Sequence, residues 1–240
     1  EAIGGIKAEL RESYTKKWED EEESLGRDEF GELFGHIRMV YRQAKPQSTL
    51  LKEFKAHVTP YQTPIAFIED VLAPMSIAFR ELRNEDYSSS KNAELVNEHF
   101  SWLNRLEFKD WVPPALMFYA RNHNSPEAMR VFFRDLERLG YSMLARKTGV
   151  NDRIERFSAL TGAIEKGTDL AMSSSSLQLT PLEQHQTYVA LSGPIYDTLS
   201  PRSLAVLLLR IDQLLSSVGA VYQHKVVSVE HVMPQQPAPN

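Results

Sequence analysis

The clearest helix in the sequence is predicted for Ser200–Gly219, whose sequence is SPRSLAVLLLRIDQLLSSVG. Ser200 and Pro201 predict a helix start, because serine caps free N–H groups and proline fits the first helical position. Apolar side chains then recur at helical spacing as far as Val218, and Gly219 is placed to end the helix. Further apolar residues widen this stripe, so we predict a central helix that is packed on more than one side.

Two charged residues, Arg210 and Asp212, interrupt this apolar helix. A buried charge is unstable without a partner, so each of them must be paired if it is buried. We interpret them as parts of a structural salt bridge rather than as catalytic groups.

Helical spacing also dominates the rest of the chain. Ser125-Pro126 and the capping box Thr180–Glu183 predict two more helix starts. Gly140 lies within the apolar face of the first of these helices and is expected to weaken it by about 1 kcal/mol. Earlier helices are expected at about 1–24, 28–44, 48–58, 64–83, 91–106 and 113–122, with a kink or break at Pro74. The sequence therefore predicts a mainly α fold, a multi-helix bundle.

One segment differs from this pattern. Residues 225–232 contain Val226, Val227 and Val229 and predict one short C-terminal β-strand that is covered on both faces. A single strand is not stable alone and needs partner strands. The serine-rich connector at 173–176 is the candidate boundary, so we predict a helical region at 1–175 and a second unit at 176–240.

Composition limits the chemistry. The 240 residues include no cysteine, so disulfides and thiolate metal sites are excluded, and any metal would be held by His, carboxylate or amide groups. The absence of cysteine also fits a reducing cytoplasm, so we expect a cytoplasmic location. The longest apolar run, Leu204–Leu209, is too short to cross a bilayer, so we expect no membrane partner. The chain begins with Glu1 rather than Met, which indicates a piece of a longer protein.

The charge pattern bears on nucleic-acid binding. A net charge of -5 argues against a DNA-binding surface spread over the whole chain. A local cluster is the exception, and its candidate phosphate-binding residues are Arg146, Lys147, Arg153 and Arg156. The alternative is a set of solvated helix faces in which nearby acidic residues balance these cations.

Two Glu-His pairs are candidates for catalysis. Glu98-His99 lies in a helical stretch, where neighbours point about 100° apart and should not share one site. Glu230-His231 ends the predicted strand just before Pro234, and there a histidine could act as general base beside a metal-binding carboxylate. Residue chemistry alone leaves open the alternative that His231 is an ordinary histidine at the end of a strand, with no catalytic role. The other histidines share no metal-ligand spacing, and no phosphate-binding glycine loop, HExxH motif or GxSxG motif is present.

The segment Val229–Gln235 resembles the "(I/V)EH(I/V)(L/M)PQ" signature of GmrSD-type restriction endonucleases. Leu207–Asp212 is similar to the leucine-rich helix that precedes that signature. Members of this family join a ParB/sulfiredoxin-like NTP-using domain to a helical region and a C-terminal HNH nuclease domain. Weaker landmarks of the helical region resemble 18–23, 34–38, 110–114, 136–139 and 153–157.

This resemblance implies that the chain holds the helical middle region and the first strand of a truncated ββα-metal (HNH) motif. It implies His231 as general base, Glu230 as metal ligand, and a divalent metal, Mg²⁺, in the complete protein, with none bound tightly here.

The function implied for the parent protein is prokaryotic, cytoplasmic restriction of foreign or modified DNA by metal-dependent phosphodiester hydrolysis, as an antiviral defence. On this interpretation DNA is the partner, and the chain by itself is inactive. Homo-oligomer formation stays open. The alternatives are a non-catalytic helical interaction module and a DNA-recognition module.

Overall fold

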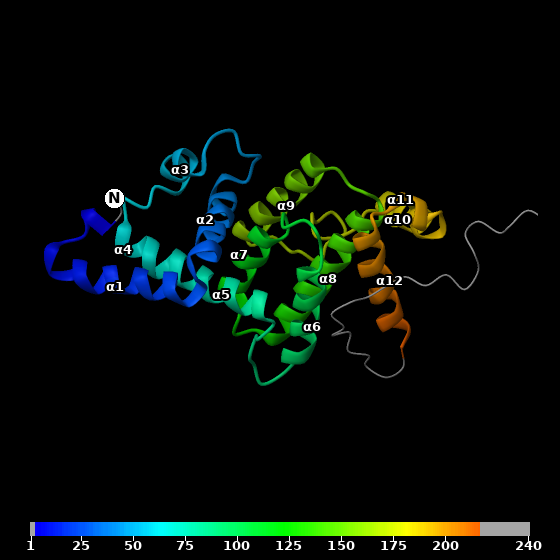
Figure 1. Cartoon of the computed structure of the whole chain (residues 1–240), viewed down its shortest axis with the longest axis horizontal. Coiled ribbons are helices and arrows are strands. Elements are labelled where there is room, and N and C mark those ends of the chain that lie inside the picture. Colours follow the sequence, from blue (N-terminus) through cyan, green and yellow to red (C-terminus); the bar gives the residue numbers. More distant parts are fainter. Residues whose placement is uncertain (1–2, 217–240) are drawn as a thin grey trace, which may run out of the picture.

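The computed structural model describes residues 3–216, and this part of the chain is a helical bundle without a β-strand (Figure 1). The predicted mainly α fold is therefore confirmed for these residues. The predicted strand at 225–232 and the helix end at Gly219 lie outside the described residues.

The helices follow one another along the chain, and the longest connection, residues 166–180, joins α9 to α10. The α-helices are α1 (Ala8–Leu25), α2 (Arg27–Arg42), α3 (Leu50–Glu53), α4 (Pro64–Ala66), α5 (Ala73–Asn84), α6 (Ala93–Asn104), α7 (Val112–Asn122), α8 (Pro126–Ala145), α9 (Val150–Glu165), α10 (Pro181–Ser192), α11 (Ile195–Thr198) and α12 (Pro201–Leu215). A 3₁₀ turn, η1 (Ile3–Gly5), precedes them, and two π-helical turns, η2 (Phe54–Val58) and η3 (Phe67–Leu72), follow α3 and α4. Helices α1 to α5 form one end of the bundle, and α10 to α12 lie at the other end (Figure 1).

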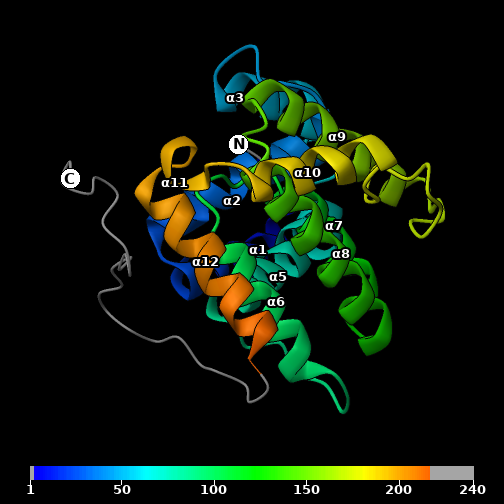
Figure 2. The same cartoon turned by 90° about the vertical axis from the view of Figure 1, so that its right-hand side faces the viewer.

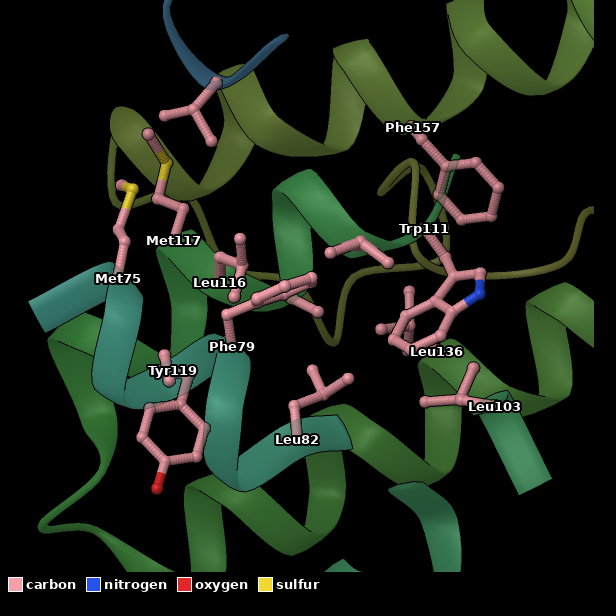
Figure 3. Packing of buried hydrophobic residues seen from close by; sticks show 14 of the residues in the cluster. Met75, Phe79, Leu82, Leu103, Trp111, Leu116, Met117, Tyr119, Leu136 and Phe157 are labelled. Carbon is pink, nitrogen blue, oxygen red and sulfur yellow. The ribbon is translucent and has the colours of Figure 1, made fainter. Parts of the chain in front are cut away.

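The hydrophobic core joins α5, α6, α7, α8 and α9. Figure 3 shows Phe79 of α5, Leu103 of α6, Leu116 of α7 and Leu136 of α8 converging beneath Phe157 of α9. Trp111 enters the same core from the connection before α7, and none of its surface is exposed. Burial of these large side chains is the main favourable term that holds the five helices together.

The helix expected at 64–83 is distorted but not ended at Pro74. The chain passes from α4 through η3 into α5, and Pro74 lies in the first turn of α5. Proline lacks the N–H that an ordinary helical turn requires, and here a wider π turn, η3, lies directly before the turn that contains Pro74. The distortion is therefore a π-helical turn rather than a helix end.

The four candidate phosphate-binding residues are divided between the end of α8 and the helix α9. Lys147 has a positive φ of 55°, and the backbone N–H of Thr148 donates to the carbonyl of Met143 at 2.9 Å. These features end α8, and the extended backbone of Gly149 then starts α9. The turn separates Arg146 and Lys147 from the two arginines of α9.

Gly140 is a point of close helix contact rather than a weak point of α8. A β-carbon at this position would lie 2.8 Å from Cδ1 of Leu106, a side chain only 1% exposed. The missing side chain lets the segment after α6 approach α8 closely.

Helix α12 lies at the edge of the bundle and is not central, as both views show (Figures 1 and 2). Only Ser203, Leu204, Leu207 and Arg210 of this helix are buried. Leu214 and Leu215, by contrast, are 68% and 79% exposed. The predicted central position is therefore wrong. Val206, Leu209 and Ile211 nevertheless pack against the core as partly buried side chains.

Candidate functional site

Arg210 attaches α12 to α8. Its Nε donates to Oε1 of Glu137 at 2.6 Å, and its Nη2 donates to Oε2 of the same carboxylate at 3.2 Å. This is the two-point geometry that makes arginine–carboxylate pairs strong and directional. The side chains are 9% and 8% exposed, so the predicted structural salt bridge of Arg210 is confirmed. Asp212 is exposed and takes no part in it.

The pair Glu98-His99 on α6 completes this cluster. Nη1 of Arg210 donates to Oε1 of Glu98 at 2.8 Å, and Nδ1 of His99 lies 2.6 Å from Oε2 of Glu137. The two α6 side chains point in different directions, but Arg210 contacts Glu98 and its partner Glu137 contacts His99. The prediction that they cannot share one site is therefore wrong. We call Glu98, His99, Glu137 and Arg210 the α12 anchor.

The electrostatics of the α12 anchor keep its arginine charged. Burial lowers the pKa of Arg210, but the charges and hydrogen bonds of Glu137 and Glu98 outweigh burial and raise it. The guanidinium also lies 5.1 Å from the centre of the Trp102 ring, a favourable cation–π arrangement. A permanent cation thus occupies the space between the two carboxylates. Across residues 3–216, no three His, Asp or Glu side chains are grouped as a metal site.

Two of the four predicted phosphate-binding residues converge on one carboxylate. Nη2 of Arg146 and Nη2 of Arg156 each lie 3.4 Å from an oxygen of Glu183. Glu183 also accepts from the backbone N–H of Thr180 in the capping box that starts α10. Arg156 donates further to the carbonyls of Ser176 and Gln178, at 2.5 and 2.6 Å. These two arginines therefore hold α10 and the loop before it against α8 and α9.

Arg153 lies against a different part of the protein. Its Nε donates to Oδ2 of Asp110 at 2.8 Å, and its Nη1 donates to the carbonyl of Thr148 at 2.8 Å. The guanidinium stands 4.5 Å from the centre of the Phe108 ring. The structure thus does not bring Arg153 together with the other predicted cations.

Lys147 is the predicted residue whose charge faces solvent. It is exposed, and within residues 3–216 its ammonium group makes no hydrogen bond or ion pair. It borders a groove of about 810 Å³ between the α8–α9 turn and α10, whose lining includes Arg146, Thr148, Asp152 and His185. We call this the α9 groove. Oγ1 of Thr148 is buried there without a hydrogen-bond partner in the described part of the chain.

Sequence reasoning missed His185 as a member of this group, because it lies 38 positions beyond Lys147 in the chain. Only the packing of α10 on α8 places both residues at one groove. The signal available in the sequence was the capping box, which fixes where α10 starts and therefore the face on which His185 lies.

Glu230 and His231 lie outside the described residues, so their roles as metal ligand and general base stay predictions. The search for related proteins gives no match to a family model, a curated protein or a solved structure. Among residues 3–216, none of the helices has the length and apolar character needed to span a membrane.

Proposed function

We propose that the described helices form the supporting and DNA-contacting region of a metal-dependent HNH-type DNA endonuclease resembling the GmrSD family. The observation that carries this proposal is the α12 anchor. The leucine-rich helix that precedes the Glu230-His231 motif is held to α6 and α8 by a buried arginine. A rigid support of this kind suits a catalytic segment, because small displacements of reacting groups reduce rates strongly.

In this proposal the chemistry belongs to Glu230 and His231. His231 takes the proton from the attacking water, and Glu230 is a metal ligand. A divalent ion such as Mg²⁺ supplies charge stabilisation at the scissile phosphate when it is bound. The remaining ligands would come from outside residues 3–216, since the described residues offer no cluster suited to a metal ion.

Contact with DNA is proposed for the α9 groove. The net charge of -5 requires this contact to be local. Lys147 supports the proposal because its charge is exposed and unpaired within the described residues, whereas Arg146, Arg153 and Arg156 are held by Glu183 and Asp110.

The test is DNA cleavage by the protein encoded by the complete gene. Supercoiled plasmid, unmodified and carrying modified bases, is incubated with the protein and Mg²⁺ or Mn²⁺. We expect metal-dependent cleavage that His231→Ala abolishes. His57→Ala, which changes an exposed histidine on η2, is the matched control and should cleave normally. Cleavage that survives His231→Ala, or intact DNA in every wild-type reaction, would reject the nuclease proposal.

A non-catalytic interaction module is the second candidate function, and the surface of α10 favours it. Leu182, Tyr188 and Val189 on this helix are 64%, 70% and 53% exposed, although large apolar side chains are usually covered. This candidate predicts self-association that Tyr188→Asp disrupts, measured by light scattering during size-exclusion chromatography. A monomeric wild type with unchanged behaviour in the variant would exclude self-association through α10.

A further inference from the structure

A second polar site surrounds Lys109, which lies in the segment between α6 and α7. A cavity of about 360 Å³ lies between α2, α7 and α9, and a smaller one of about 180 Å³ lies between α2 and α5. Glu32 and Lys109 line both cavities, so these two side chains stand where they meet. We call the larger cavity the Lys109 pocket.

The acidic residues of the pocket already have cationic partners. Glu32 lies 3.0 Å from Nη1 of Arg83 and 3.4 Å from Nε2 of His36. Asp110 is paired with Arg153 at 2.8 Å. Each carboxylate is therefore engaged by an arginine, although Arg83 also pairs with Glu29 at 3.1 Å.

Lys109 is different, because it has no ion-pair partner within residues 3–216. Its Nζ donates to the backbone carbonyl of Asn104 at 3.1 Å, and no carboxylate of residues 3–216 lies within ion-pair distance of it. Burial lowers the pKa of Lys109, and the neighbouring Arg83 lowers it further, more than Glu32 raises it. Such an environment favours an added negative charge beside the ammonium group.

The opposite wall supplies an unsatisfied hydroxyl. Ser158 of α9 lines the pocket and is 9% exposed, and its Oγ has no hydrogen-bond partner in the described part of the chain. A buried hydroxyl without a partner is destabilising, so a ligand that bonds to it would remove that penalty. The rest of the lining includes the apolar side chains Met39, Ile154 and Phe157. It also includes a second cation, Arg38, whose Nε is buried without a hydrogen-bond partner in the described part of the chain.

Gly35 of α2 also lines the Lys109 pocket, and its lack of a side chain leaves space there for a ligand. A β-carbon built at this position would meet no heavy atom within 4 Å. The pocket is at the small end of the range for ligand sites, which suits a compact molecule.

We propose that the Lys109 pocket binds a small organic carboxylate, with the carboxylate on the Lys109 ammonium and its apolar body against Met39, Ile154 and Phe157. Lys109 has no ion-pair partner within residues 3–216, whereas Arg38, which also lines the pocket, is paired with Glu53 at 3.3 Å. Together with the apolar side chains, these cations favour a monoanion that carries an apolar group over inorganic phosphate, which has no apolar part. The inference is independent of the nuclease proposal, because it uses neither the α12 anchor nor the Glu-His motif.

Calorimetric titration of the protein with benzoate, with neutral benzamide and with inorganic phosphate tests the proposal. We expect benzoate to bind at least about tenfold more tightly than benzamide, because a charge-assisted hydrogen bond contributes that much. Benzoate should also bind more tightly than phosphate, because phosphate has no apolar group to bury against the lining. Lys109→Met should weaken benzoate binding roughly ten- to hundredfold, and Lys109→Arg should retain it. Equal affinity for benzoate and benzamide, tighter binding of phosphate, or no benzoate binding would overturn the proposal.

A pair of space-filling variants separates ligand loss from misfolding. Gly35→Leu fills the pocket without touching Lys109 and should abolish benzoate binding. Gly31→Leu adds the same side chain at an exposed position of α2 and should not change it. Thermal unfolding without ligand checks that each variant folds. Benzoate binding that persists in folded Gly35→Leu would place the ligand elsewhere and reject the site.

Discussion

Arg210 and Glu137 form a two-point ion pair of 2.6 and 3.2 Å between α12 and α8, and each side chain is more than nine-tenths buried. The two residues are 73 positions apart in the sequence. The pair therefore determines where the last described helix lies relative to the core. It also orders His99 and Glu98, which contact the same two side chains.

Replacing Arg210 by Met should lower the free energy of unfolding by about 3–5 kcal/mol, because Glu137 is then left buried without its cation. Urea denaturation monitored by circular dichroism measures this change. Arg202→Met is the matched control on the same helix. Its side chain is 70% exposed and lies 3.9 Å from Glu107, so the expected change is under about 1 kcal/mol. Equal effects of the two variants would contradict the proposed anchoring role.

Gly140→Ala should destabilise the protein even though alanine favours helices. The added carbon would lie 2.8 Å from Leu106 Cδ1, and overpacking of this kind costs about 1–3 kcal/mol. This exceeds the helix gain of at most about 1 kcal/mol. Gly31→Ala in α2 has open space at its β-carbon and should stabilise by about 0.5–1 kcal/mol. Opposite signs in chemical denaturation are the expected result, and a stabilised Gly140→Ala would show that Leu106 moves aside freely.

The carboxylate of Glu53 should make stability depend on acid pH. Hydrogen bonds from the backbone N–H groups of Gln47 and Ser48, at 2.6 and 2.9 Å, and the charges of Arg42 and Arg38 lower the pKa of Glu53 in spite of burial. Between the lowered pKa of the folded protein and the ordinary pKa, the unfolded chain binds more protons than the folded protein, so stability rises with pH there. The contribution is complete above the ordinary glutamate pKa of 4.5 and is lost as pH falls through the lower folded value.

Unfolding free energies measured from about pH 6 down to about pH 3 test this, since linkage predicts a shallower slope when the titrating group is removed. Glu53→Gln should be less stable than the wild type near neutrality and less sensitive to acid. Parallel pH profiles for the two proteins would show that Glu53 titrates normally.

Local sequence signals predicted the helices well, because capping and apolar spacing act over a few residues. The hydroxyl of Ser200 accepts from the N–H of Ser203 at 3.0 Å, and that of Thr180 accepts from Glu183 at 3.2 Å, as the patterns indicated. Ser125 precedes α8 as expected, but its side chain makes no capping hydrogen bond.

Features that depend on distant segments were not predictable in this way. A side chain is excluded at position 140 because Leu106 lies too close. Glu98 and His99 belong to one cluster because of Arg210, which lies 112 positions beyond Glu98 in the sequence. The position of α12 at the edge likewise depends on which helices are available to cover it. In each case the deciding partner is brought close only by the tertiary fold.

Substitutions at Lys147 and Arg156 should have different effects, because Lys147 is a candidate for DNA contact and Arg156 is a structural residue. Lys147→Gln removes an exposed charge that has no partner within residues 3–216, so stability should change by less than about 0.5 kcal/mol. If Lys147 contacts a phosphate, the variant should depend less on salt, and the slope of log affinity against log salt should become less negative by about 0.9. Arg156→Gln removes hydrogen bonds to two backbone carbonyls and to Glu183, so it should destabilise the protein by about 1–3 kcal/mol.

Fluorescence anisotropy with labelled duplex DNA at several salt concentrations measures the slope, and urea denaturation measures the stability. Lys166→Gln, at the opposite end of α9, is the control for a change of net charge alone and should leave the salt slope unchanged. The same slope for wild type, Lys147→Gln and Lys166→Gln would remove the α9 groove from the DNA-binding surface. Equal changes for the two lysines would instead indicate a general charge effect, because a specific phosphate contact depends on position.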